Sequence, residues 1–304
     1  MHELATSRGS SAGSAGAILL SGGGRPRSGP LGPLTAVGRG AKPPSEARRI
    51  ALLGGVYANA HALEAVLADA RAQGAEAVYC LGDVGGFGPH PDRVFPLLSD
   101  AGVGCVQGNY DEAVAAGAAD CGCGYTDPRD NHFAGISYAY TLAHTSTGHR
   151  RWLAALPRAL RVDLGGHRLL LCHGSPRQIN EFLWESATPD GLIRKFLRDA
   201  GADVICCTHT GVAWHRALPE GHLVNIGAIG RPQNDGRTEV WYALLTGAPN
   251  LRVEFVPVVY DHEALAREME AEGLPPEFVE TIRTGWWTTC LEVLPAKERA
   301  RGKF

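Results

Sequence analysis

The sequence lacks any apolar run long enough to cross a membrane. A spanning helix needs roughly 20 consecutive apolar residues, whereas the longest apolar stretches here are strand-sized, such as residues 168–173. The chain also lacks an excess of one charge, because 29 basic and 32 acidic side chains give a net charge of -3. No dense basic stripe interleaved with aromatic residues is present. We therefore expect neither a membrane nor a nucleic acid as a partner.

Cysteine usage gives little sign of a disulfide framework. Most of the eight cysteines lie inside apolar, strand-like runs, which is typical of reduced thiols in the core of a cytoplasmic protein. Cys121 and Cys123 stand apart, close to Asp127, Asp130 and His132. Two interpretations remain open for this pair. Thiolates and imidazole suit zinc, but a second pair of sulfur or imidazole ligands is missing, which favours a tight loop with two packed cysteines.

Residues 1–49 lack the composition of a folded segment. Gly, Ser and Pro make up 22 of these 49 positions, and only two are acidic. Such a segment cannot bury enough apolar surface to order itself. A faint likeness to a transit peptide and to the apolar part of a signal sequence is incomplete in both cases. We predict a disordered Gly/Ser/Pro-rich extension over 1–49 and a single domain with C-terminal helices over 50–304, since 44% hydrophobic content supports a sizeable core.

From Ile50 onward, strand-like and helix-like patterns alternate. The pattern predicts strands at 49–54, 76–83 and 104–109, with helices at 60–74 and 90–102 between them. This repeating βαβ order is typical of α/β proteins, whose ligands bind at the loops that follow the strands.

The second half of the chain predicts a further sheet and its covering helices. A mainly helical section at 111–157 comes first. Further strands are predicted at 160–166, 168–174, 202–210, 222–228, 238–245 and 252–260, with a helix at 189–201. The amphipathic segments 261–273 and 275–285 read as helices that cover a sheet.

Polar side chains with metal-binding potential follow four of the predicted strands. They are Asp83, Asn109, His173 and His209, and we call them the strand-end tetrad. Carboxylate and amide oxygens together with two imidazoles form a mixed ligand set suited to manganese, iron or zinc. A single histidine in a strand is more often a hydrogen-bonded core residue. Four such residues at successive strand ends instead indicate a metal site.

The order of these motifs resembles the calcineurin-like metallophosphoesterase family, whose pattern is D-x-H, G-D, G-N-H-[DE], H and G-H-x-H. The resemblance extends from about Ile50 to Leu245 and includes "LGDVGGFGPHPDRV", "HGSP" and "VNIGAIGRPQNDGRTEVWYAL", which look like the bacterial branch of small phosphoesterases. It implies a four-layer αββα sandwich of two mixed β-sheets. It also implies two metals that share Asp83 and activate a bridging water.

The departures from the family pattern fall on one of the two metals. The positions of the first metal site read Gly55, Tyr57, Asp83 and Gly211, so that only Asp83 remains a ligand. Glycine has no side-chain ligand, and a tyrosine phenol is a poor one at neutral pH. The second site corresponds to the complete strand-end tetrad. The resemblance therefore implies a degenerate first site and one divalent ion per chain.

Two further positions bear on catalysis. The proton-donating histidine of the family corresponds to Tyr110, a weaker acid toward a leaving alkoxide. Asp111, which orients that donor in the family, is available to bond Tyr110. Alternatively, Tyr57 and Tyr110 simply fill the volume that lost function has vacated.

Arginines near the predicted loops could hold an anion. Arg177, Arg216 and Arg231 each follow a strand-end motif and could bind a phosphate in a bidentate manner, although surface solvation is the alternative for each.

The leading prediction is a metal-dependent phosphoesterase of low activity on a small phosphodiester or phosphomonoester. The alternative is a catalytically inactive binding or sensor protein that keeps the metal and a pocket for a phosphate-like anion. The sequence gives no indication of oligomeric state.

Overall fold

The computed structural model describes residues 47–302. The predicted extension over 1–49 thus lies almost wholly outside the described residues. The first strand begins at Arg49, and Ala47 before it is fully buried. Among the helices described, none has the length and apolar character needed to span a membrane.

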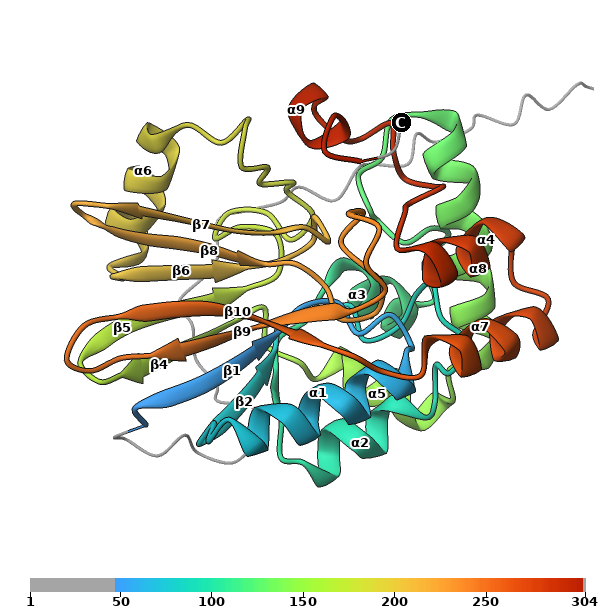
Figure 1. The fold of residues 1–304 in the computed structure, drawn as a ribbon, viewed down its shortest axis with the longest axis horizontal. Helices are drawn as coiled ribbons and strands as arrows, with labels where there is room; N and C mark the ends of the chain where they lie inside the picture. Colours follow the sequence, from blue (N-terminus) through green and yellow to red (C-terminus); the bar gives the residue numbers. More distant parts are fainter. Residues whose placement is uncertain (1–46, 303–304) are drawn as a thin grey trace, which may run out of the picture. The chain divides into compact units, whose positions relative to one another are not determined.

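The chain forms two five-stranded sheets, as Figure 1 shows. The first has the order β10-β9-β1-β2-β3 and the second the order β4-β5-β6-β8-β7. The strands of the first sheet are β1 (Arg49–Leu53), β2 (Ala77–Cys80), β3 (Gly104–Cys105), β9 (Val240–Thr246) and β10 (Arg252–Val258). Those of the second are β4 (Ala159–Leu164), β5 (His167–Cys172), β6 (Val204–Cys207), β7 (Ala213–Leu218) and β8 (Gly221–Ile226).

Both sheets are mixed, as predicted. Strand β1 pairs in parallel with β2 and antiparallel with β9, while β5 pairs antiparallel with β4 and in parallel with β6. The inner faces meet in one apolar cluster that includes Leu52 of β1, Leu171 of β5 and Val224 of β8. Strands covered on both faces are apolar nearly throughout, which explains why Ile50–Leu53 are all buried.

Helices cover the outer faces of both sheets. On the first sheet, Leu63 of α1 and Phe278 of α8 pack into a cluster shared with β1 and β9, whereas Ile193 of α6 packs on the second sheet. The helices are α1 (Ala60–Ala72), α2 (Val94–Asp100), α3 (Asn109–Ala116), α4 (Pro128–His144), α5 (Thr147–Ala154), α6 (Asp190–Ala200), α7 (His262–Ala271), α8 (Pro276–Thr284) and α9 (Ala296–Arg299). The predicted αββα arrangement is confirmed (Figure 1).

Two elements were not predicted, and several others, including β2, β3, β6 and α2, differ from their expected bounds. Strand β3 ends at Cys105 rather than at 109, because Asn109 is the first residue of helix α3. Strand β7 and the short helix α9 were not predicted. Strand β7 mixes half-buried and exposed positions at the edge of its sheet, so its sequence lacks the apolar run by which the other strands are recognised.

Candidate metal centre and adjoining cavity

The strand-end tetrad comes together at one edge of the two sheets. Asp83 follows β2, Asn109 begins α3 after β3, His173 follows β5, and His209 follows β6. The carboxyl ends of these strands therefore deliver ligands from both sheets. All four side chains are buried, with exposed fractions between 1% and 8%.

Three of the four side chains aim their donor atoms at one point. The His173 Nε2 atom lies 3.2 Å from Asp83 Oδ2 and 3.1 Å from His209 Nδ1. Neighbouring ligands around a single ion, each about 2.1 Å from it, are separated by roughly 3 Å. The three residues form one of the two groups of potential metal ligands in the described part of the chain. Their spacing fits one divalent ion.

Asn109 adds an oxygen that is suited to the same role. Its Oδ1 atom is buried and has no hydrogen-bond partner among the described residues. Its Nδ2 atom donates to the Cys121 carbonyl at 2.9 Å, which fixes the orientation of the amide. A buried acceptor without a donor is costly, and a bound cation would satisfy it.

Hydrogen bonds and burial prepare the two histidines for metal binding. His173 Nδ1 lies 2.6 Å from the Leu81 carbonyl; it donates its proton there and leaves Nε2 free as a ligand. Burial, assisted by His173, lowers the pKa of His209 to about 3, so its imidazole is neutral. Burial raises the pKa of Asp83, but His173 and His209 bring it below its ordinary value. Burial lowers the pKa of His173, but Asp83 brings it above its ordinary value, so a metal ion at this point would take the place of a proton between the two side chains.

Asp111 holds the backbone around Asp83. Its carboxylate accepts hydrogen bonds from the backbone N–H groups of Asp83 at 2.8 Å, Val84 at 2.9 Å and Gly108 at 2.8 Å. Burial raises the pKa of Asp111 to about 6, and the nearby Asp83 acts in the same direction. Gly108 is required here, since a Cβ atom would lie 2.3 Å from Asp83 Oδ1. Asp111 is thus a positioning residue for the loop that carries Asp83.

Tyr110 is engaged differently from the sequence-based expectation. Its hydroxyl donates to Ser137 Oγ at 3.0 Å, not to Asp111, whose oxygens bind backbone amides. Burial raises the pKa of Tyr110, which makes its phenol reluctant to release a proton. Its backbone N–H donates to Asp83 Oδ1 at 3.1 Å. The hydrogen bond expected between the Tyr110 and Asp111 side chains does not form, because each side chain has other partners.

Other side chains fill the positions that the resemblance assigns to the first metal. The ring of Tyr57 lies over Gly55, where a Cβ atom would come within 2.3 Å of it. A Cβ atom on Gly211 would lie 3.2 Å from the Trp287 ring and 3.4 Å from an Arg231 nitrogen. An aromatic ring and a guanidinium therefore occupy the space beside Asp83.

Arg231 is a buried cation held by aromatic rings. Its exposed fraction is 7%, and its guanidinium carbon lies 3.6 Å from the centroid of the Trp287 ring. The rings of Tyr57 and Phe87 each lie 5.9 Å from that carbon. The Nε atom of Arg231 is buried and has no hydrogen-bond partner in the described part of the chain. A cation–aromatic arrangement that leaves a donor unpaired is suited to an anion.

A cavity of about 60 Å³ adjoins the metal centre. Asp83, His209, Arg231 and Tyr110 line it, together with aromatic rings such as Phe278 of α8. Five of the seven non-glycine residues with positive φ in residues 47–302 line this cavity, namely Tyr57, Asp83, Phe87, His209 and Cys290. Because strained backbone clusters at functional sites, this concentration marks the cavity as the candidate site.

The other candidate arginines lie elsewhere. Arg177 pairs with Glu181 and stacks on Phe196, and Arg216 pairs with Asp190. Neither lines the cavity. Of the arginines proposed from sequence, the structure brings only Arg231 to the metal centre.

The Cys121–Cys123 segment also differs from expectation. The two cysteines form a disulfide, whereas the sequence predicts reduced thiols, and the other six cysteines are free and buried. Their proximity in a tight turn allows this bond. With both sulfurs joined and Asp130 bonded to the Val293 N–H at 3.0 Å, the segment does not form the alternative zinc site. It instead supports the tetrad, since His209 Nε2 lies 3.2 Å from the Cys123 carbonyl.

A family model described as a calcineurin-like phosphoesterase superfamily domain matches residues 49–247. The chain therefore belongs to the calcineurin-like phosphoesterase superfamily. Phe278, Thr289 and Cys290, which line the cavity from α8 and the segment after it, lie beyond the matched range.

Three individual proteins are similar to this chain. The metallophosphoesterase from Sphaerobacter thermophilus is 26% identical, with a TM-score of 0.61 over 79% of this chain and 99% of its own. The hypothetical protein PH1004 from Pyrococcus horikoshii OT3 shares the fold, at 22% identity and a TM-score of 0.67 over 79% of this chain and 99% of its own. Uncharacterized protein MJ0912 of Methanocaldococcus jannaschii is 25% identical over 253 residues, which span 78% of this chain and 98% of that protein.

Proposed function

We propose that the protein is a phosphoesterase that works with one divalent metal ion and one buried arginine. The observation that carries the proposal is the convergence of Asp83, His173 and His209 at one point, next to a cavity that Asp83, His209 and Arg231 line. Manganese, iron or zinc suits the strand-end tetrad. The degenerate first site then holds a guanidinium where related enzymes place their other ion. The likeness to the Sphaerobacter metallophosphoesterase supports the reaction class.

The chain's own residues would divide the work as follows. The tetrad would hold the ion, which would supply Lewis acidity and lower the pKa of a water molecule. Arg231 binds phosphoryl oxygens through its free donors and offsets the charge that develops on them. Asp111 keeps the backbone of the Asp83 loop in place through three hydrogen bonds. The aromatic wall excludes bulk water, which strengthens both electrostatic contacts.

Tyr110 limits the range of leaving groups. Its phenol is bonded to Ser137, and burial raises its pKa, so it is a poor proton donor. Esters whose leaving oxygen departs as a stable anion should react, and esters of alkyl alcohols should react far more slowly. This property also favours the second candidate function, a binding or sensor protein that captures a small phosphate-like anion without turnover.

One assay separates the two functions. Turnover of 4-nitrophenyl phosphate mono- and diesters is measured with added Mn²⁺, using wild type, Asp83→Ala and, as a control outside the site, Arg177→Gln. The phosphoesterase proposal predicts manganese-dependent turnover that Asp83→Ala abolishes and Arg177→Gln retains. Binding of inorganic phosphate without turnover by any form would support the binding protein instead.

A further inference from the structure

A second group of potential metal ligands lies apart from the strand-end tetrad. It consists of His61, His90 and Glu268, and we call it the histidine–glutamate cluster. His61 is in the first turn of α1, His90 is in the loop between β2 and α2, and Glu268 is on α7. Three segments that are distant in the sequence thus present ligands to one another.

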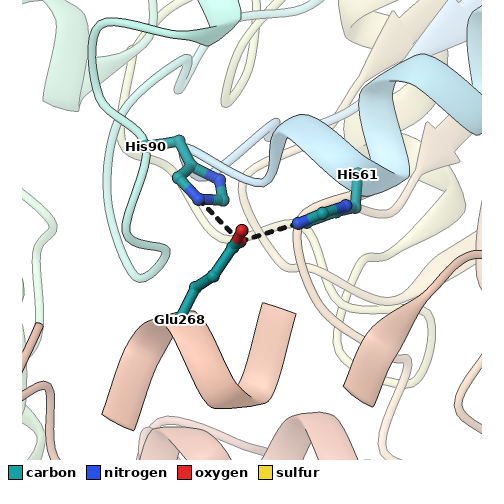
Figure 2. A group of neighbouring side chains, drawn as sticks. All are labelled: His61, His90 and Glu268. Atoms are coloured by element: carbon teal, nitrogen blue, oxygen red, sulfur yellow. Dashed lines mark hydrogen bonds and ion pairs between the residues drawn. The ribbon is translucent and has the colours of Figure 1, made fainter. Parts of the chain in front are cut away.

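The two imidazoles converge on a single carboxylate oxygen, as Figure 2 shows. Glu268 Oε2 lies 2.7 Å from His61 Nε2 and 2.8 Å from His90 Nε2. The three donor atoms all lie within 4.8 Å of one another. Two histidines and one glutamate form a ligand set that zinc uses in proteins, with a further position left for water.

Neither neutral tautomer of His90 satisfies all of its hydrogen-bonding contacts in the structure. Its Nε2 atom faces both the Glu268 oxygen and the Arg93 Nη1 donor at 3.0 Å, while its Nδ1 atom is buried without a partner among the described residues. If the proton is on Nδ1, the lone pair of Nε2 faces the Glu268 carboxylate, and two acceptors meet. If the proton is on Nε2, the Nε2–H group faces the Arg93 guanidinium, and two donors meet.

A bound cation removes the conflict at His90 Nε2 between the Glu268 carboxylate and the Arg93 guanidinium. The lone pair of His90 Nε2 turns to the ion, while Arg93, whose side chain is 52% exposed, moves outward. The other Glu268 oxygen, Oε1, lies 3.7 Å from Arg93 Nη1 and remains available to pair with it. Half-exposure of Glu268 gives the ion a route of entry from solvent.

We propose that the histidine–glutamate cluster binds a divalent transition metal, with Zn²⁺ as the best match, at a site separate from the catalytic centre. The ion joins α7 to α1 and to the His90 loop. Helix α7 is followed by α8, whose Phe278 lines the cavity, and by a segment in which Cys290 lines the cavity and Trp287 stacks on Arg231. The metal therefore fixes the C-terminal segment over the catalytic centre.

Zinc content of full-length proteins tests the proposal. Elemental analysis after loading with Zn²⁺ and dialysis should give two ions per chain for wild type and for the exposed-surface control His144→Ala. Glu268→Gln and His61→Gln should each lose one ion, His209→Ala should lose the other, and the double variant Glu268→Gln/His209→Ala should lose both. Equal zinc content in wild type and Glu268→Gln would overturn the proposal.

The design keeps this proposal distinct from the proposed function and from misfolding. If the tetrad binds no metal, wild type holds one ion and Glu268→Gln none, which still supports the cluster. Zn²⁺ at about 100 times its dissociation constant should raise the thermal midpoint of His209→Ala by roughly 5 °C or more. The same addition should leave Glu268→Gln/His209→Ala unchanged, although both proteins should unfold at similar temperatures without metal. Equal zinc-induced shifts in both would contradict the assignment.

Discussion

Arg231 is the residue on which the catalytic proposal turns. Its guanidinium is buried, stacked on Trp287, and unpaired at Nε within residues 47–302. A hydrogen bond to a charged group contributes about 1.5–3 kcal/mol. Arg231→Met should therefore lower kcat/KM for an aryl phosphate by roughly 10- to 100-fold, and weaken inhibition by inorganic phosphate to a similar extent.

The metal content of Arg231→Met shows whether a lower kcat/KM comes from the lost guanidinium or from damage to the metal site. Arg231→Met should bind as much Mn²⁺ as wild type, because Arg231 is not a ligand. Arg177→Met, whose guanidinium pairs with Glu181 outside the cavity, should keep full activity. An Arg231→Met protein with wild-type kcat/KM would rule out a role for the guanidinium in binding the phosphoryl group.

Among single residues, the sequence predicts which side chains come together better than it predicts what surrounds them. The strand-end tetrad follows from where strands end, and Arg231 from its place in a strand-end motif. The partners of Tyr110 and Asp111 could not be predicted, because they depend on which backbone amides a turn exposes. Trp287 was missed for a similar reason: a tryptophan pair near the C-terminus does not reveal which cation it will cover.

The loops after β1 and β6 carry Gly55, Tyr57 and Gly211, which the family resemblance places at the first metal site. Replacing Gly55→Asp, Tyr57→His and Gly211→His together removes the ring that obstructs a side chain at position 55. The Arg231 guanidinium still lies 3.4 Å from a Cβ at position 211 and repels a second cation. We expect the triple variant to hold one ion in the cavity, and the quadruple variant with Arg231→Gln to hold two. Mn²⁺ counted by elemental analysis in a Glu268→Gln background tests this, and two ions already in the triple variant would contradict it.

The segment after α8 contributes a large share of the packing around the cavity. The Trp287 side chain is 1% exposed, and its indole Nε1 donates to the Pro232 carbonyl at 2.6 Å. The backbone N–H of Trp287 donates to Asn234 Oδ1 at 2.8 Å. Trp287→Ala should lower the free energy of unfolding by about 3–5 kcal/mol. Urea denaturation measures this, with Trp286→Ala, a half-buried neighbour, as the control that should lose less. Equal losses would show that Trp287 is not the anchor of this segment.

Elements were predictable where their periodicity was strong. The fully buried strands and the amphipathic helices α6, α7 and α8 follow from apolar patterns. The start of α3 at Asn109 could not be predicted in this way, because the motif "GNYD" can belong either to the end of a short strand or to the first turn of a helix. That start matters for function, since it places the Tyr110 N–H against Asp83.

For the whole molecule, the folded domain should not need the first 46 residues. Their composition provides little apolar surface to bury, so deletion of residues 1–46 should change the thermal midpoint by less than about 2 °C. Deletion of 1–49 should lower it by several degrees, since it removes the buried Ala47 and the Arg49 bonds to Gln73 at 2.8 Å and to Thr246 at 3.3 Å. Scanning calorimetry measures the thermal midpoints of the two truncated proteins. A midpoint that falls by several degrees when only residues 1–46 are deleted would contradict the expectation.

The central claim is that the cavity between the strand ends holds one metal ion beside a guanidinium. Electron paramagnetic resonance of Mn²⁺ bound to Glu268→Gln protein tests it most directly, because this variant removes the histidine–glutamate cluster while leaving the strand-end tetrad intact. The account predicts the spectrum of an isolated Mn²⁺ ion, which disappears in the additional variant His209→Ala. The spectrum of an exchange-coupled pair of Mn²⁺ ions would contradict it, since two neighbouring ions leave no place for Arg231.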